Sequence, residues 1–354
     1  MNGGGAYQET AVLYRSNAQS RAIEEALLRV SIPYRIYGGL RFYERLEIKN
    51  AIAYLRVIFN NNDNPSFERS ISNPTRGVGE KTLAKIRYTA KQYNISYIKA
   101  SAKLIDEGSI SGRGGAGLRD YLEFITGCKS FIEENLLSEL MELIIKESGL
   151  YAYHAKEPGE KGKTRTENLE ELITATKNFE QSIKEDKTNF EIAENYLDII
   201  SLDSGDRQAS EHDDAAQLMT MHSAKGLEFK LVLITGLEES LFPHGRSMES
   251  ASQLEEERRL CYVAVTRAME KLYITHAESR RLHGTDTFNP PSRFLREIPK
   301  DLINEIRPRA QTNIPYNRKD FNETKVEFEE ELSLIHISEP TRRYAISYAV
   351  FCLK

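Results

Sequence analysis

The stretch QLMTMHSAKGLEFKLVLITG, residues 217–236, decides the fold. It contains two apolar runs, at 217–221 and 229–236, whose Leu, Met, Val and Ile residues predict two β-strands. In open α/β sheets ligands bind at loops next to strand ends, and a lysine beside a glycine there can approach a phosphate closely. The polar residues of the connecting loop are candidates for such a site: His222, Ser223, Lys225 and Glu228. A solvated turn explains the same spacing equally well.

Similar patterns lie nearer the two ends of the chain. Residues 11–15 predict an apolar strand, a helix follows, and residues 33–38 predict another strand. Further along, a helix over 254–271 precedes a strand over 272–277. Strand–loop–strand and helix–strand order indicates an α/β fold with a mostly parallel sheet covered on both faces.

Helical periodicity fills the region between these segments, from residue 46 to about 200. The two halves of the sheet must therefore meet in space around an all-helical insertion. Glycine-rich breaks at 75–82 and 111–118 and a charged loop at 157–165 punctuate the helices. The charged loop contains Gly-Lys-Thr, but Glu157 stands where a phosphate-binding loop needs its first glycine, so we reject that function.

The first glycine-rich break, TRGVGEKT, is a candidate nucleic-acid interface. A Gly-x-Gly turn between helices presents consecutive backbone N–H groups to a phosphate, and basic side chains nearby add attraction. The candidate residues are Arg76, Gly77, Gly79 and Lys81. A tight connection between two helices is an equally good explanation.

Two further places carry side chains suited to a nucleotide. Tyr14 and Arg15 end the first strand, where a ring can stack on a base and a guanidinium can pair with phosphate. A buried tyrosine and a surface arginine are the alternative. Arg267, near the end of the helix predicted over 254–271, either reaches a γ-phosphate across a cleft or complements the helix dipole from the surface.

Composition narrows the class of protein. The chain has 354 residues, of which 40% are apolar and 29% charged, as in a soluble protein of about two domains. Its net charge is 48 − 53 = −5, so any DNA-binding face must be local. Three cysteines, at 128, 261 and 352, lack the spacing of a metal site or a disulfide framework. Without a signal peptide or an apolar run of ~20 residues, we expect a cytoplasmic protein that does not contact membranes.

Six motifs occur in order: LYRSNAQSR, GGLRFYERLEIK, NPTRGVGEKT, ENLEEL, QLMTMHSAKGLEF and LEEERRLCYVAVTRAMEKL. Together, over about residues 11–299, they resemble the C-terminal half of a superfamily 1 DNA helicase of the UvrD/PcrA/Rep type. The resemblance implies a RecA-like parallel-sheet domain, the second of two motor domains, interrupted by an all-helical accessory domain. It also implies ATP-dependent movement along one DNA strand in the 3′ to 5′ direction.

The resemblance assigns roles to the candidate residues. Tyr14 would stack on the adenine of ATP, and Arg15 would contact its γ-phosphate. Lys225 would also lie near the γ-phosphate, Glu228 would bind the ribose, and Arg267 would be the arginine finger.

On the DNA side, His222 and Ser223 would face the single strand. The helical insertion would contact the duplex at its junction with that strand.

The resemblance also divides the chain. Residues 1–108 would be the first part of the motor domain with a helical extension, 109–213 the accessory domain, 214–300 the second part of the motor domain, and 301–354 a tail. Residues 332–354 do not fit the family and resemble translated sequencing-adapter sequence, so we expect them to be non-native. A genuine apolar helix or strand is the alternative.

The sequence contains no G-x-x-x-x-G-K-[ST] phosphate loop and no acidic strand motif that binds Mg²⁺. The expected cofactors are ATP and Mg²⁺, with the metal ligands on an N-terminal motor domain missing from this chain. We therefore expect the chain alone to hydrolyse little ATP. Expected partners are that domain, single-stranded DNA with a duplex junction, and repair proteins. Two other functions stay open: a non-catalytic DNA-binding module, and one half of a naturally split helicase.

Overall fold

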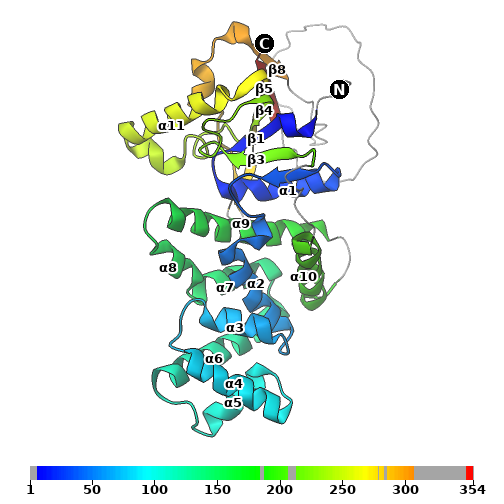
Figure 1. Ribbon diagram of the computed structural model, residues 1–354, viewed down its shortest axis with the longest axis vertical. Helices are drawn as coiled ribbons and strands as arrows, with labels where there is room; N and C mark the ends of the chain where they lie inside the picture. The colour runs from blue at the N-terminus through cyan, green and yellow to red at the C-terminus, as the bar shows by residue number, and fades with distance from the viewer. Residues whose placement is uncertain are drawn as a thin grey trace, which may run out of the picture.

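The computed structural model describes residues 6–183, 187–205, 213–277, 279–282, 285–306 and 348–353. These residues form two stacked parts (Figure 1). We call the upper part, which holds the large sheet, the sheet module, and the lower part the helical body. Helix α9 (Glu160–Ser182) lies on the side of the helical body that faces the sheet module.

The sheet has the strand order β2-β3-β1-β4-β5-β9-β8. The first five strands in this order are parallel, as the sequence predicts. Their bounds are β1 Thr10–Tyr14, β2 Tyr34–Ile36, β3 Ala216–Thr220, β4 Phe229–Ile234 and β5 Ala268–Ala277. Ala11 pairs with Gln217, so strands about 200 residues apart in sequence lie side by side. The two halves of the sheet do meet around the helical insertion.

Both faces of the sheet are covered. In β1, Ala11 and Leu13 pack on the face under helix α11 (Ala251–Val265), and Val12 and Tyr14 pack on the face under helix α1 (Ser20–Arg29). This alternation follows from the two-residue period of a strand, and a strand buried on both faces is apolar at every position.

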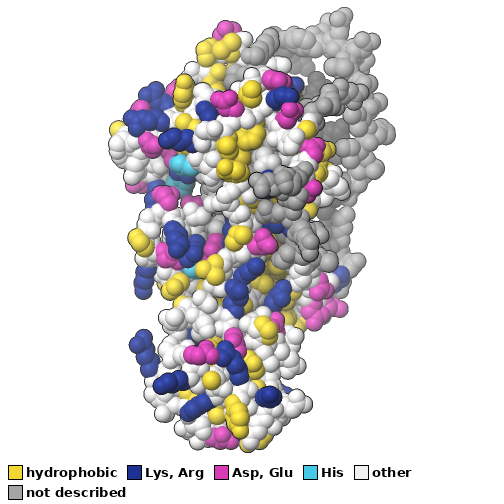
Figure 2. All heavy atoms as spheres, viewed as in Figure 1, with side chains coloured by type: hydrophobic (Ala, Val, Ile, Leu, Met, Phe, Trp, Pro, Cys, Tyr) yellow, Lys and Arg dark blue, Asp and Glu magenta, His cyan; other side chains and the backbone are white. Residues whose placement is uncertain are grey.

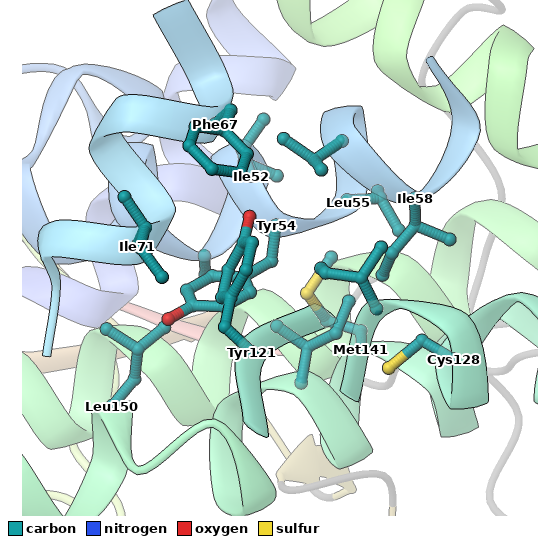
Figure 3. Packing of buried hydrophobic residues seen from close by; sticks show 14 of the residues in the cluster. Ile52, Tyr54, Leu55, Ile58, Phe67, Ile71, Tyr121, Cys128, Met141 and Leu150 are labelled. Atoms are coloured by element: carbon teal, nitrogen blue, oxygen red, sulfur yellow. The ribbon is translucent and has the colours of Figure 1, made fainter. Parts of the chain in front are cut away.

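The helical body is built on one apolar core, which includes residues from Phe42 to Ile200. Figure 3 shows the packing of its aromatic centre, where the ring of Tyr121 lies 5.5 Å from that of Phe67 and its hydroxyl lies 2.6 Å from Ser70 Oγ. The helices are α2 Leu46–Phe59, α3 Asn64–Ser72, α4 Glu80–Tyr93, α5 Tyr97–Asp106, α6 Gly112–Glu134, α7 Leu137–Glu147, α8 Leu150–Ala155, α9 and α10 Asn189–Gly205.

This core extends across the predicted domain boundary. The division at 108/109 would separate α2–α5 from α6–α10, yet both groups of helices contribute to the same buried cluster. The chain leaves β2 at the Gly38–Gly39 turn, and the helices of the helical body follow this turn. Periodicity in the sequence shows that a helix is apolar on one face but does not show which helix covers that face.

Three local predictions are also wrong. Residues 112–118 of the second glycine-rich break are the first turns of α6, and residues 160–165 of the charged loop are the first turns of α9. Helix α11 ends at Val265 and β5 begins at Ala268, so the predicted helix is too long. In each case packing against neighbouring elements decides the local structure.

The end of the chain contributes two antiparallel strands, β8 (Ile303–Ile306) and β9 (Tyr348–Leu353), beyond β5. The strand β9 lies within the tail expected to be non-native and agrees with the alternative of an apolar strand. The rest of that tail, 332–347 and residue 354, lies outside the described residues. No helix in the described part of the chain is long and apolar enough to cross a membrane.

Candidate nucleotide and DNA site

The carboxyl edge of the sheet carries the first group of candidate residues. Because β1 and β3 are parallel, Arg15 and the turn that begins at Met221 leave the sheet at the same edge. Thr220 fixes the start of this turn, because its Oγ1 accepts a hydrogen bond from Ser223 N at 3.2 Å and lies 2.9 Å from Ser223 Oγ. The His222 side chain next to it is exposed.

The pKa of His222 is lower than that of an ordinary histidine. Desolvation lowers its pKa below the ordinary histidine value, and the positive charge of Arg15 lowers it further. A lowered pKa favours the neutral imidazole, which is able to stack or to form a neutral hydrogen bond. Ser223 adds a hydroxyl beside it.

Arg15 has a partner within the protein. Its Nε lies 3.0 Å from Glu257 Oε2 and its Nη2 lies 2.7 Å from Glu257 Oε1, a bidentate ion pair. The same carboxylate accepts a hydrogen bond from the backbone N–H of His244 at 3.3 Å. Burial alone would raise the pKa of Glu257, but these contacts hold it below its ordinary value. Arg15 thus ties the end of β1 to α11.

Tyr14 does not fit the adenine-stacking role expected for it. Its side chain is completely buried, in the apolar layer that also contains Val12 and Leu218. Desolvation raises the pKa of its hydroxyl, which has no hydrogen-bond partner among the described residues. A ring inside this layer cannot also lie against a base, because its faces already contact neighbouring side chains. In this structure Tyr14 is a buried residue of the apolar layer, as in the alternative given above.

The amino edge of the sheet carries the second group. Arg267 lies in the turn between α11 and β5, and its guanidinium donates three hydrogen bonds: from Nε to Val263 O at 3.0 Å, from Nη1 to Leu227 O at 2.9 Å and from Nη2 to Thr266 Oγ1 at 3.0 Å. It therefore caps the carboxyl end of α11 and also holds the turn that follows His222. Glu228, next to Leu227, is exposed.

The structure does not bring Arg15 and Arg267 together. Leu13 pairs with Ile234, the last residue of β4, so Arg15 lies past the carboxyl end of β4. Ala268 pairs with Phe229, the first residue of β4, so Arg267 lies ahead of its amino end. The strand between these two ends is about 16 Å long at 3.3 Å per residue. One γ-phosphate cannot contact both side chains as they lie here, so the shared role expected of them is wrong for this conformation.

Lys225 lies in the turn between the two edges. Its side chain is exposed and makes no hydrogen bond or ion pair with the part of the chain that the structure describes. An ammonium group in this position is available to an anionic ligand.

The glycine turn of the helical body is mostly exposed. Gly77, Gly79 and Lys81 face solvent, and Gly79 is the N-cap of α4. On the face shown in Figure 2, Lys and Arg side chains recur along the helical body, with acidic side chains between them. The net charge of −5 is therefore compatible with a local basic surface.

Arg76 is the exception in this turn. Its guanidinium donates to the carbonyls of Ser70, Pro74 and Ser148 and lies over the rings of Tyr54 and Tyr121. These contacts hold it against the core, so its predicted contact with a phosphate is wrong in this structure. The alternative explanation, a connection that fastens two helices, is correct for this residue.

The second glycine-rich segment packs on the first. A Cβ on Gly117 would overlap the carbonyl oxygen of Arg76, and a Cβ on Gly114 would lie 3.1 Å from the carbonyl oxygen of Gly77. The exposed side chain of Arg113 covers Gly77. The glycines at 112–117 allow this close approach of α6 to the first glycine turn, and they do not mark a break between helices.

Sequence reasoning also missed the acidic residues that organise the edges. Glu257 lies 242 residues from Arg15, and Glu167 of α9 accepts a hydrogen bond from Ser16 and lies 3.5 Å from His244 Nε2. Their sequence neighbours give no hint of these partners, because several glutamates stand next to each of them.

Comparisons with known proteins agree with this architecture. The family model described as UvrD-like helicase C-terminal domain matches residues 1–111 and 119–279. DNA helicase II of Escherichia coli is 46% identical over 324 residues, which are 92% of this chain and 45% of that protein. The ATP-dependent DNA helicase PcrA of Leuconostoc citreum is 40% identical over 321 residues, 89% of this chain and 43% of that protein.

The chain thus spans less than half the length of these relatives. The matched family segments include both edges of the sheet and nearly all of the helical body. With a match over most of its length, the chain belongs to the family of UvrD-like helicase C-terminal domains.

Proposed function

We propose that the chain is the second motor domain and the accessory body of an ATP-dependent DNA helicase that moves 3′ to 5′ along one strand. One observation carries the proposal. The turn HSAKGLE begins at the carboxyl edge with His222 and reaches the amino edge, where Leu227 O accepts a hydrogen bond from Arg267 at 2.9 Å. A change at one edge is therefore transmitted to the other through a single short turn.

The nucleotide belongs to the amino edge in this proposal. All three hydrogen bonds of the Arg267 guanidinium go to uncharged oxygens. A phosphate accepts stronger, charge-assisted hydrogen bonds from a guanidinium than a carbonyl does, so a γ-phosphate would draw Arg267 away from Leu227. Lys225 and Glu228 are exposed beside it and would hold phosphate and ribose. ATP supplies the free energy of hydrolysis when bound.

DNA belongs to the carboxyl edge and to the helical body. His222 and Ser223 would contact the single strand. The ion pair between Arg15 and Glu257 holds the end of β1 at this edge in place. Gly77, Gly79 and Lys81 would contact the duplex through backbone N–H groups and one ammonium group. Such contacts are independent of base sequence, as a moving helicase requires.

The first motor domain, with the phosphate loop and the ligands of Mg²⁺, would complete the nucleotide site. Within the described residues there is no group of three or more His, Cys, Asp or Glu side chains that could hold a metal ion. Because Arg267 binds ATP better than ADP when it contacts the γ-phosphate, ATP would favour the closed pair of domains and ADP the open pair.

The test is ATP hydrolysis with and without single-stranded DNA, on this chain alone and rejoined to a phosphate-loop domain from its own locus. We expect turnover only after rejoining. Arg267→Ala should then lower turnover by roughly 10³-fold, the smaller effect known for arginine fingers. The matched control is Arg259→Ala, because Arg259 is an exposed residue of α11 that pairs with the exposed Glu256.

Turnover that survives Arg267→Ala would overturn the assigned nucleotide site. Absence of turnover in the rejoined protein, with duplex binding retained, would indicate a non-catalytic DNA-binding module instead.

A further inference from the structure

The turn Tyr37–Gly38–Gly39–Leu40 leaves the sheet beside the His222 turn. Ile36, the last residue of β2, pairs with Leu218, and Tyr37 N donates to Leu218 O at 2.8 Å. The chain therefore emerges at the carboxyl edge. Gly38 has a φ of +73°, and a Cβ there would lie 3.9 Å from Ser223 Oγ. The two turns are in contact.

Tyr37 and Leu40 are exposed, although the two residues that flank the turn, Ile36 and Arg41, are buried. Tyr37 is 45% exposed and Leu40 56%, whereas Ile36 is 6% exposed and Arg41 only 2%. The buried residues anchor the turn at both ends, because Arg41 Nε donates to Tyr34 OH at 3.1 Å. The apolar side chains between these anchors are held outward, with no apolar core to cover them.

We propose that Tyr37, with Leu40 beside it, is a stacking platform for an unpaired base of the DNA strand that crosses His222 and Ser223. The inference rests on the proposed function, which places single-stranded DNA at this edge. Aromatic side chains bind successive bases of a single strand by stacking, regardless of base identity. Neutral His222 beside this turn suits the same contact.

The position of the turn also favours DNA as its occupant. Residues 37–41 connect β2 of the sheet module to α2 of the helical body, which carries the proposed duplex surface. A base held on Tyr37 would therefore lie where a strand passes from duplex to single strand. The platform would hold the first unpaired base.

The test uses the full chain, which contains no tryptophan. Tyr37→Trp creates one fluorophore at the platform, and Tyr262→Trp creates one on the exposed face of α11, where Tyr262 is 72% exposed. Each variant is titrated with a single-stranded thymidine 16-mer while the anisotropy of a labelled 16-mer reports binding separately. We expect the 16-mer to quench the tryptophan at 37 and leave the one at 262 unchanged.

Affinity supplies the second readout. Tyr37→Ala should weaken binding of the 16-mer about tenfold, within the range for one lost base–aromatic stack, and Tyr37→Phe should retain it. The salt dependence of binding should stay the same, because tyrosine neutralises no phosphate. If Tyr37→Ala fails to fold, the Phe and Trp variants still decide the question.

Binding of the 16-mer without quenching at 37 would overturn the platform and leave the proposed function standing. Wild-type affinity of Tyr37→Ala would do the same. If the wild-type chain causes no change in anisotropy, both the proposed single-stranded DNA site and the platform are refuted.

Discussion

The sheet module and the helical body differ in how their cores are assembled. In the sheet module, apolar layers lie on both faces of neighbouring strands that are more than 200 residues apart in sequence. In the helical body, successive helices surround one apolar core. Both cores are apolar, so each part has its own source of stability from burial.

The contact between the two parts is polar. Arg45, at the N-cap of α2, donates to the carbonyl of Asn17 and to Asn168 Oδ1, each at 2.9 Å, and to Ser20 Oγ at 2.6 Å. Arg21 of α1 pairs with Glu171 of α9 at 2.6 Å. Contacts between domains that can move are typically polar. Apolar residues therefore stabilise each part, and a separate set of polar residues connects the two parts.

The largest effect should follow loss of the central cation of this contact. Arg45→Met leaves the carboxylate of Glu24 buried without this cation and removes the donor to Asn168 Oδ1 and Ser20 Oγ. Removing one member of a buried pair costs about 3 kcal/mol. We expect the free energy of unfolding in urea to fall by that amount and the two parts to unfold in separate steps. Arg56→Met is the control, because Arg56 contacts Ser201 in an exposed hydrogen bond. A single unchanged transition would show that the polar contact does not join the parts.

A smaller effect should come from inside the helical body. Gly117→Ala forces a Cβ against the carbonyl of Arg76, which should lower the free energy of unfolding by about 1–3 kcal/mol. Gly127→Ala, in the same helix, meets nothing within 4 Å and should raise it by about 0.5–1 kcal/mol. Thermal unfolding of the two variants measures both. Equal effects of the two would mean that α6 does not pack closely on the glycine turn.

The smallest effect should be a dependence of the polar contact on pH. Burial alone would raise the pKa of Glu167, but hydrogen bonds with His244 and Ser16 and the charge of Arg15 lower it below its ordinary value of 4.5. The stabilisation is therefore complete above 4.5 and disappears as the pH falls through the lower pKa of the folded state. In Glu167→Gln, the free energy of unfolding should depend less on pH in this range than it does in the wild type. Glu142→Gln, on the exposed face of α7, should keep the pH dependence of the wild type. Identical profiles for wild type and Glu167→Gln would refute this contribution.

Prediction from the sequence succeeded where a pattern is local. The run at 229–236 contains β4, and the parallel sheet follows from apolar strands alternating with loops and helices. Prediction failed where the role of a side chain depends on a residue that is distant in sequence but close in the fold. Tyr14 reads equally well as a nucleotide contact or as a core residue, and only the layer under α1 makes it a core residue. Arg76 reads as a cation for phosphate, but two tyrosine rings and three carbonyls hold it.

The sequence by itself determined the fold class, the helical insertion and the family, because periodicity and ordered motifs are properties of the chain. Tertiary structure alone decided which candidates share a site. It separated Arg15 from Arg267 by the length of β4, joined Arg15 to Glu257 across 242 residues, and placed Gly38, the neighbour of Tyr37, beside Ser223. The physical reason is that a side chain's function depends on what it contacts, and strand register and helix packing set those contacts over distances that sequence spacing does not encode.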